Sequence, residues 1–461
     1  MDDRIIVALR SAMPAGTLRT DSASRVAAGY DNSRRQVLPD AVAVPANADE
    51  VAAVVRVCHD HRTPVVARGL GTATTGAAVP VKRGIVLSFE RMDRIIALDP
   101  ANRTIIVEPG VLNSEVQRAA GEAGFFWAPD PTSARYSTVG GNLACNAGGP
   151  RAVKYGTVRE NVLGLRAVTG TGESIRTGTS TTKGVVGYDL TRLLLGSEGT
   201  LALITEATLK LTPLQPARAT LRAEYRDAVS AARAVARIMA GGITPCTLEF
   251  MDGTAIELVR AFDDVGVSEK AGALLLVECD GDARTAAADL AIVCALADTD
   301  GVLDLNVAQD NAAIESLWRC RRALSPAQRK LKPHKINEDV AVPVSRLPRL
   351  VGGIAELGRK HRVLIVSFGH AGNGNLHVNL LGDPAAGDEL ARMHACLDDL
   401  FALVLSLEGT LSGEHGIGYD KREFLALEIA PPALILMQAI KRQFDPHCIL
   451  NPGKVFPDAG H

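Results

Sequence analysis

Two histidines flank a glycine-rich turn in the C-terminal half of the chain. The apolar run 364–369 predicts a strand that ends at His370, and after the turn residues 376–380 alternate between apolar and polar side chains. The alternation places His377 and Asn379 on one face of a second strand. The flexible turn between the strands lets both imidazoles converge, as in a site for a first-row divalent metal.

A carboxylate and a third histidine are adjacent at Glu414 and His415, with glycines on either side. Neighbouring side chains of an extended backbone point to opposite sides, so Glu414 is expected to bind the metal while His415 faces a substrate. Any one of these histidines alone would be interpreted as structural. Four ionisable groups in two glycine-rich turns are costly to bury without a chemical task, so the set predicts metal-assisted acid–base chemistry.

A glycine-rich loop at residues 69–76 follows an apolar strand at 63–67. Such a loop lets consecutive backbone N–H groups converge on an anion, and a diphosphate would fit. The loop departs from a dinucleotide-binding fingerprint because Thr74 replaces the third glycine, and from a P-loop because Ala77 and Ala78 follow it. Taken alone, it is equally well a tight turn.

More glycine-rich backbone follows, between residues 129 and 149 and again at 195–201. Few folds need two long glycine-rich stretches of backbone. The pattern indicates backbone wrapped closely around an extended cofactor.

Elements that could position these loops alternate along the chain in an α+β order. Asn47 is a candidate N-cap for a helix that runs to Cys58, and Pro213 and Pro216 close a strand and mark a domain boundary. Beyond it, two strands each precede an alanine-rich helix, as in a sheet covered by helices on one face. We expect domains at 1–215, 216–440 and 441–461, the last being a segment that returns to the first domain.

Composition excludes several classes of protein. Fifty basic and 52 acidic residues give a net charge of −2, which argues against nucleic acid as the main partner. The eight cysteines form no C-x-x-C pair, so the sequence specifies neither a zinc ribbon nor an iron–sulfur cluster. The N-terminus is acidic where a signal peptide would be basic. No apolar run approaches the roughly 18 residues that span a bilayer. We expect a cytoplasmic protein, with peripheral membrane docking and a homodimer left open.

The glycine-rich segments resemble the FAD-binding domain of the vanillyl-alcohol-oxidase superfamily, although Leu70 and Ala73 depart from its usual first loop. The resemblance implies a two-part domain with the FAD diphosphate at the first loop and the ribityl and isoalloxazine along the second. No histidine lies beside the first loop, so FAD is expected to bind non-covalently. The cofactor-binding residues implied are Arg68, Gly69, Leu70, Gly71, Thr72, Thr75, Gly76, Pro129, Asp130, Thr138, Gly140, Gly141, Asn142, Asn146, Gly148, Gly149, Glu198, Gly199, Ile204 and Asn451.

The C-terminal motifs, together with Ile336-Asn337-Glu338-Asp339 and Asn451-Pro452-Gly453-Lys454, resemble FAD-linked D-2-hydroxyacid dehydrogenases. The resemblance implies that His370, His377 and Glu414 bind zinc or another divalent metal and that His415 is the base. Three arginines follow Trp318, and the family's Trp-x-x-Arg spacing selects Arg321 as the anchor of the substrate carboxylate. Ser325, one helical turn further on, and Asn379 complete the expected catalytic set.

The expected reaction is oxidation of a D-2-hydroxy acid, with electrons passed to a quinone, a cytochrome or an electron-transfer flavoprotein. Relatives that act on D-2-hydroxyglutarate carry a lysine where Asn337 lies, whereas here Lys335 is displaced by two positions and Glu338 adds a charge that would repel a dianion. We therefore expect a D-lactate-type substrate first and D-2-hydroxyglutarate second.

Two other interpretations stay open. The chain could be the flavin subunit of a larger glycolate oxidase complex. A zinc hydrolase is the alternative from another class, with His415 activating water, but it leaves the glycine-rich loops unexplained.

Overall fold

The computed structural model describes residues 3–262, 265–308, 310–328 and 332–457, and the chain forms two compact units. Unit 1 contains residues 1–149, 156–214 and 414–461, and unit 2 contains residues 150–155 and 215–413. The division at Leu214 lies beside the boundary expected at 215. The chain re-enters unit 1 at Glu414 rather than at 441, because the loop after Glu414 pairs with the first glycine-rich loop: the Thr75 carbonyl accepts from the N–H groups of Tyr419 and Asp420.

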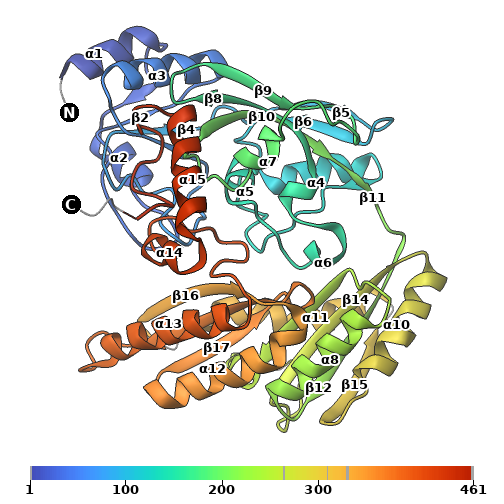
Figure 1. The fold of residues 1–461 in the computed structure, drawn as a ribbon. Helices are drawn as coiled ribbons and strands as arrows, with labels where there is room; N and C mark the ends of the chain where they lie inside the picture. Colours follow the sequence, from blue (N-terminus) through green and yellow to red (C-terminus); the bar gives the residue numbers. More distant parts are fainter. Residues whose placement is uncertain (1–2, 263–264, 309, 329–331, 458–461) are drawn as a thin grey trace. The chain divides into compact units, whose positions relative to one another are not determined.

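Unit 1 contains a four-stranded sheet around which the N-terminal helices pack (Figure 1). β2 and β3 pair parallel with β4, and β1 pairs antiparallel with β2. Asn47 caps α3 by accepting from the Glu50 N–H at 2.9 Å, as the sequence predicts. The elements are α1 (Asp3–Ala12), β1 (Leu18–Arg19), α2 (Ser22–Ala28), β2 (Ala41–Ala43), α3 (Ala48–Asp60), β3 (Val65–Arg68) and β4 (Ile85–Ser88).

A second, five-stranded antiparallel sheet in the order β5-β6-β10-β8-β9 completes unit 1 around a core that contains the fully buried Trp127. The short strands β7 (Phe125–Phe126) and β11 (Thr212–Pro213) pair beside it. The remaining elements of unit 1 are β5 (Ile95–Asp99), β6 (Thr104–Val107), α4 (Asn113–Glu122), α5 (Val139–Cys145), β8 (Val162–Thr169), β9 (Ser174–Gly178), α7 (Leu190–Leu194), β10 (Ala202–Lys210), α14 (Leu425–Glu428) and α15 (Pro431–Phe444).

Unit 2 is built on a seven-stranded sheet in the order β15-β12-β14-β13-β17-β18-β16, in which every pair is antiparallel. The two-part first domain and the antiparallel second domain confirm the predicted α+β fold. The strands are β12 (Ala217–Tyr225), β13 (Thr247–Asp252), β14 (Ala273–Gly281), β15 (Val302–Ala308), β16 (His334–Ala341), β17 (Leu364–Gly369) and β18 (Asn375–Gly382).

Helices pack on both faces of this sheet rather than on one. Four long helices pack against one another and against one face, while α9 and α11 pack together on the strands of the other. The first group is α8 (Ala228–Ala240), α10 (Ala283–Ala297), α12 (Leu347–His361) and α13 (Glu389–Ser406); the second is α9 (Gly253–Arg260) and α11 (Asn311–Gln328); α6 (Ala152–Tyr155) joins unit 2 separately.

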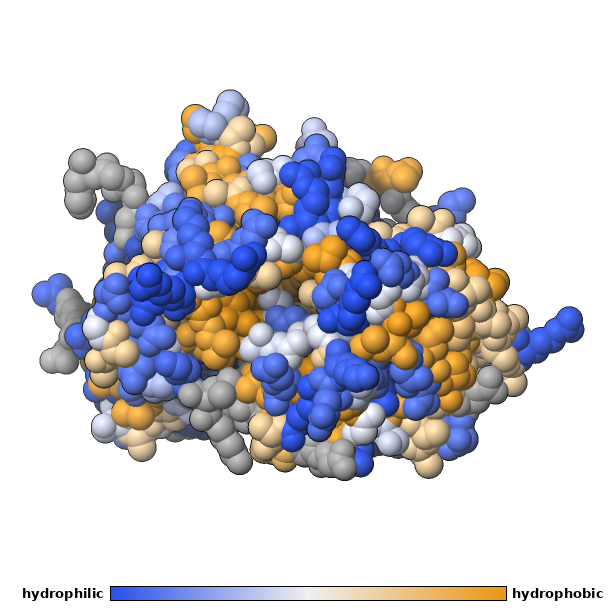
Figure 2. Space-filling view, turned by 90° about the horizontal axis from the view of Figure 1, so that it is seen from below, coloured by the Kyte–Doolittle hydropathy of each residue, from blue (hydrophilic) through white to orange (hydrophobic). Residues whose placement is uncertain are grey.

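Polar and apolar residues share the outer surface. Seen from below, hydrophilic residues cover much of the surface and apolar residues form patches between them (Figure 2). Across the described ranges, no helix combines the length and the apolar character needed to cross a membrane.

Candidate functional site

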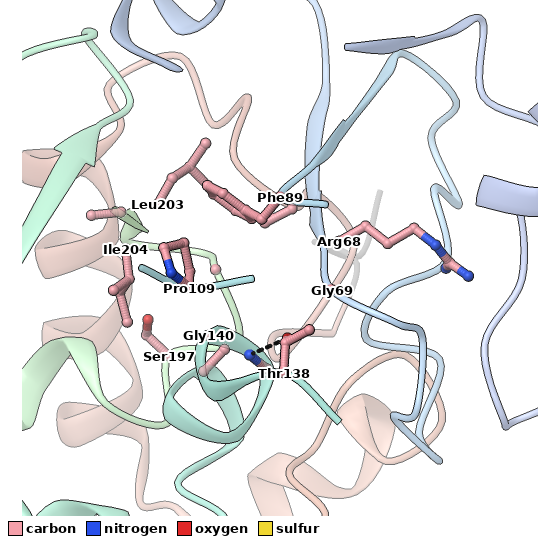
Figure 3. Close-up of a pocket in the computed structure, with 14 residues that line it drawn as sticks. Arg68, Gly69, Phe89, Pro109, Thr138, Gly140, Ser197, Leu203 and Ile204 are labelled. Carbon is pink, nitrogen blue, oxygen red and sulfur yellow. Dashed lines mark hydrogen bonds between the residues drawn. The ribbon is translucent and has the colours of Figure 1, made fainter. Parts of the chain in front are cut away.

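All three glycine-rich segments line a hollow of about 460 Å³ in unit 1 (Figure 3). Arg68 and Gly69 come from the end of β3, Thr138 and Gly140 from the start of α5, and Ser197 from the turn before β10. The complete lining is Ala67, Arg68, Gly69, Phe89, Pro109, Thr138, Gly140, Gly141, Ala144, Ser197, Gly199, Ala202, Leu203 and Ile204. Segments far apart in sequence thus form one concave surface of the kind that holds a cofactor.

A larger hollow of about 1760 Å³ shares Arg68, Gly69 and Thr138 with the first and adds Leu70 to the lining. The Leu70 side chain is 52 % exposed. The departure from glycine at this position is therefore accommodated without crowding.

The first glycine-rich loop presents unused backbone donors. Within the described residues, no N–H from Gly69 to Thr75 donates a hydrogen bond to another protein group. Gly71 has a φ of +67°, a backbone conformation that favours glycine. Arg68 extends away from the hollow and donates to the Tyr30 carbonyl at 2.5 Å (Figure 3). Such a run of free N–H groups suits the diphosphate of a dinucleotide.

Two buried polar atoms near the second segment also fit a polar ligand. Ser137 Oγ and Asn142 Nδ2 are buried, and neither has a hydrogen-bond partner among the described residues. Thr138 caps α5 by accepting from the Gly141 N–H at 3.3 Å. Because orphaned buried polar atoms are rare, this part of unit 1 is suited to a polar ligand.

Glu198 and Asn451, both expected to bind the cofactor, also hold loops of unit 1 together. The Glu198 carboxylate accepts from the N–H groups of Ile417 and Gly418, each at 2.8 Å. Asn451 Nδ2 donates to the carbonyls of Ala77 and Glu198. Burial raises the pKa of Glu198, although these hydrogen bonds oppose the shift.

The remaining residues expected to bind the cofactor lie in the same loops without lining either hollow. Asn146 ends α5 in the left-handed conformation, and its Oδ1 accepts from Thr157 and Arg159. The others are Gly71, Thr72, Thr75, Gly76, Pro129, Asp130, Asn142, Gly148 and Gly149.

In unit 2, the turn between β17 and β18 brings the two predicted histidines together. The rings of His370 and His377 lie edge to face with centroids 5.3 Å apart, and both residues are buried. His370 Nδ1 lies 2.5 Å from Glu249 Oε1, and His377 Nδ1 lies 3.7 Å from Asp339 Oδ1. Each ring therefore turns Nδ1 towards a buried carboxylate. The His370 contact is a hydrogen bond, whereas the 3.7 Å separation at His377 is too long for one.

Arg321 lies beside the same carboxylate as His370. Its Nε donates to Glu249 Oε2 at 2.7 Å, and its guanidinium carbon lies 4.8 Å from the Phe368 ring centre. Burial alone would raise the pKa of Glu249, but the charges of His370 and Arg321 bring it down to about 2. Ser325 lies in α11, and its side chain is outside the described part of the structure.

The register between β16 and β18 decides which residues share the sheet face of His377, called the histidine face below. Asn337 lies opposite Asn379, and Asp339 lies opposite His377, so these four side chains share one face of the sheet. Asn379 is fully buried, and its Oδ1 lacks a hydrogen-bond partner among the described residues. Glu338 lies on the opposite face. This placement corrects the expectation that Glu338 repels a dianionic substrate.

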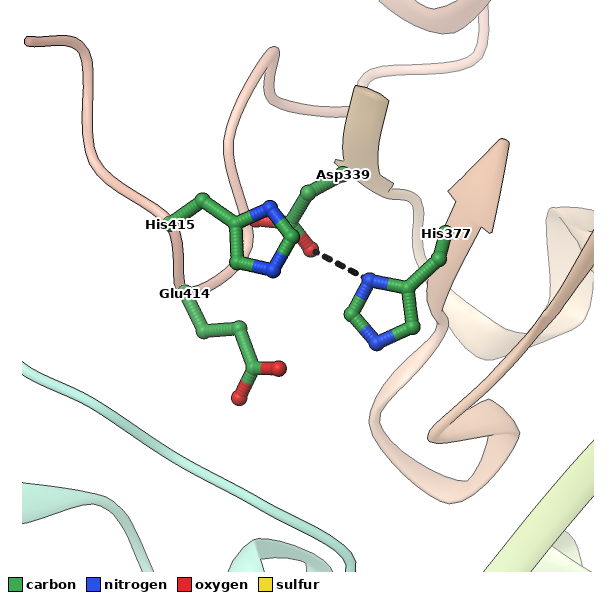
Figure 4. Close-up of side chains that lie close together, drawn as sticks. All are labelled: Asp339, His377, Glu414 and His415. Carbon is green, nitrogen blue, oxygen red and sulfur yellow. Dashed lines mark ion pairs between the residues drawn. The ribbon is translucent and has the colours of Figure 1, made fainter. Parts of the chain in front are cut away.

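The segment that carries Glu414 and His415 is bent rather than extended. Gly413, the last residue of unit 2, donates its N–H to the Asp339 carbonyl at 3.1 Å, and the next two residues follow directly. Asp339, His377, Glu414 and His415 each offer a ligand atom, and these atoms lie within 4.8 Å of one another (Figure 4). The expected opposite orientation of Glu414 and His415 is thus wrong, because bends replace the alternation of a strand. His370 is outside this group of four.

Comparisons with known proteins cover both units. Residues 214–455 match the model of the C-terminal domain of FAD linked oxidases, and residues 39–178 match the FAD binding domain. The glycolate oxidase subunit GlcD of Bacillus subtilis (strain 168) is 39 % identical, over 94 % of this chain and 93 % of that protein. The chain belongs to the FAD-linked oxidases.

Other relatives of this FAD-linked oxidase carry different names. A D-lactate dehydrogenase of Anaerostipes hadrus is 33 % identical over 92 % of this chain and 90 % of that protein. A D-2-hydroxyglutarate dehydrogenase of Xanthomonas citri pv. viticola is 34 % identical over 99 % and 98 %. Substrate-bound p-cresol methylhydroxylase has the same fold, with a TM-score of 0.80 at 17 % identity over 99 % of this chain and 97 % of that one.

The donor chemistry of this FAD-linked oxidase fits a divalent metal. Ligating histidines commonly hydrogen-bond a carboxylate through their other nitrogen, as His370 does with Glu249, and imidazole with carboxylate suits zinc. The sequence interpretation missed Glu249 and gave Asp339 no role. The available signal for Glu249 was one carboxylate inside the apolar run 247–251.

Proposed function

We propose that this enzyme oxidises a small D-2-hydroxy acid to the 2-oxo acid, with FAD as electron acceptor and a divalent metal, zinc, at the histidines. The observation that carries the proposal is the pair of buried histidines backed by carboxylates beside Arg321, in a chain of this family. His370, His377 and Glu414 are the proposed ligands, and Asp339 is a further candidate.

Bound FAD would supply the acceptor for the hydride that leaves C2, and the metal would supply the Lewis acidity that lowers the pKa of the substrate hydroxyl. Arg321 holds the substrate carboxylate through its terminal nitrogens, because Glu249 occupies Nε. His415 accepts the hydroxyl proton. Asn379 orients the substrate with its buried Oδ1, and Ser325 completes the proposed set.

The site favours a monocarboxylate such as D-lactate. Asn337 offers a neutral amide on the histidine face, and Lys335 lies on that face two residues away, about 7 Å along the strand. A second carboxylate without a charged partner in a desolvated site costs on the order of 2–5 kcal/mol. D-2-hydroxyglutarate and, in a multi-subunit complex, glycolate are the next candidates. We propose a quinone, a cytochrome or an electron-transfer flavoprotein as the electron acceptor.

The test is turnover of purified protein with a panel of hydroxy acids and a dye acceptor. We expect flavin to co-purify with the protein, D-lactate to be oxidised and L-lactate to be a poor substrate. A colourless protein that takes up no FAD and hydrolyses esters or amides would support the zinc hydrolase instead. A higher kcat/KM for D-2-hydroxyglutarate than for D-lactate would overturn the proposed substrate order.

A further inference from the structure

We propose that Glu249 is a positioning residue that sets the spacing between the metal-binding histidine and the arginine that holds the substrate carboxylate. This inference rests on the proposed function and concerns a residue outside the proposed metal ligands and catalytic set. One carboxylate contacts both groups, with Oε1 at 2.5 Å from His370 Nδ1 and Oε2 at 2.7 Å from Arg321 Nε.

The fold holds Glu249 firmly in this position. It lies in β13, between β14 and β17, and its side chain is 1 % exposed. Phe250 pairs with Gly369, so Glu249 lies next to the position where the chain leaves β17 and His370 begins the turn. Arg321 reaches Glu249 from α11, with its guanidinium near the Phe368 ring. Strand, turn and helix therefore meet at a single carboxylate.

Each contact fixes one chemical property. The contact with His370 holds Nδ1 against Glu249, so the ring turns Nε2 towards the proposed metal site. The contact with Arg321 uses Nε and leaves the two terminal nitrogens of the guanidinium for the planar carboxylate of the substrate. The two oxygens of a carboxylate have a fixed separation, so metal ligand and anchor cannot move independently.

A 2-hydroxy acid carries its hydroxyl and its carboxylate on adjacent carbons. A site that binds both groups at once needs its metal and its arginine at a matching spacing, whereas a 3-hydroxy acid needs a wider one. Glu249 therefore selects the position of the hydroxyl as well as supporting the site.

Glu278 offers a matched control. It is a buried glutamate on the neighbouring strand β14 and accepts hydrogen bonds from Thr220 Oγ1 at 3.0 Å and Trp318 Nε1 at 3.2 Å. Its side chain also lies 3.6 Å from Arg218 Nη1, and none of these three partners belongs to the proposed site. Glu278→Gln thus reproduces the loss of a buried charge from the same sheet without changing the proposed site.

The experiment compares the wild-type holoenzyme with Glu249→Gln, Glu249→Asp and Glu278→Gln. Zinc affinity is measured by competition with a chromogenic chelator, and kcat and KM are measured for D-lactate and D-3-hydroxybutyrate; flavin content reports folding. We expect Glu249→Gln to lower zinc affinity by about 10–100-fold and to raise the KM for D-lactate about tenfold or more, with reduced preference for the 2-hydroxy acid. Glu278→Gln should keep both values within about twofold of wild type.

The shorter Glu249→Asp should lose one or both contacts and serves as the second variant if Glu249→Gln takes up no flavin. A Glu249 variant with normal zinc affinity and normal KM would overturn the proposal, as would a change in only one of them. A wild-type enzyme that binds no zinc and oxidises no 2-hydroxy acid would instead refute the proposed function itself.

Discussion

Gly140 tests whether the start of α5 is a wall of the flavin site. The Gly140 N–H donates to the Pro109 carbonyl at 2.8 Å, so the two backbones are in direct contact. An added Cβ would lie 2.6 Å from Pro109 Cβ and 2.9 Å from its carbonyl oxygen. These atoms belong to the ring and backbone of a proline, which cannot rotate away, so Gly140→Ala must displace α5.

Gly141 supplies the matched control. A Cβ at Gly141 would meet only Thr138 Oγ1, at 3.4 Å, which is ordinary contact. Both substitutions gain a similar helix propensity, about 0.5–1 kcal/mol for glycine to alanine. The difference in unfolding free energy between the two variants therefore isolates the cost of the clash. Overpacking of this kind destabilises a protein by about 1–3 kcal/mol.

The assay is urea unfolding of the flavin-stripped proteins, together with the flavin content of the proteins as purified. We expect Gly140→Ala to be less stable than Gly141→Ala by that amount and to retain less flavin than wild type. Equal stabilities for the two variants, or a more stable Gly140→Ala, would show that α5 does not pack against Pro109 as described.

Three further predictions concern the base, the metal and a buried lysine. His415→Ala should lower kcat for D-lactate by about 10²-fold or more while flavin content stays normal, as loss of a general base does; an unchanged rate would remove His415 from the mechanism. Exhaustive chelation should abolish turnover without releasing flavin, and added zinc should restore it; full activity in the chelated enzyme would refute the role of the metal. Burial lowers the pKa of Lys454 to about 8 from 10.5, so between these values the unfolded chain holds a proton that the folded chain has lost, and stability rises with pH. Lys454→Met should lack this contribution of at most about 1.4 kcal/mol per pH unit, measured by urea unfolding of both proteins across that window, and an identical pH dependence for the two would contradict the assignment.

Local patterns predicted much of the fold. The two-residue alternation around His377 correctly indicated a strand, and the glycines between the histidines correctly indicated the turn that brings their rings to 5.3 Å. Capping chemistry located the start of α3. These features depend on residues close together in sequence, where periodicity and turn propensity are informative.

Residues that act through tertiary contacts were beyond this reasoning. Glu249 meets His370 only because β13 pairs with β17, a register that no local pattern specifies. The side occupied by Glu338 depends on the pairing of β16 with β18. Glu198 has the glycine-rich surroundings of a cofactor ligand, yet its carboxylate binds backbone N–H groups of a loop more than two hundred residues away.

The most direct test of the proposed function is anaerobic reduction of the bound flavin by D-lactate, followed through the loss of its visible absorbance without any added acceptor. We expect rapid and complete bleaching with D-lactate, little with L-lactate, and none with D-lactate after the metal has been removed. A flavin that stays oxidised with D-lactate and with D-2-hydroxyglutarate, in a protein loaded with both FAD and zinc, would contradict the proposed reaction.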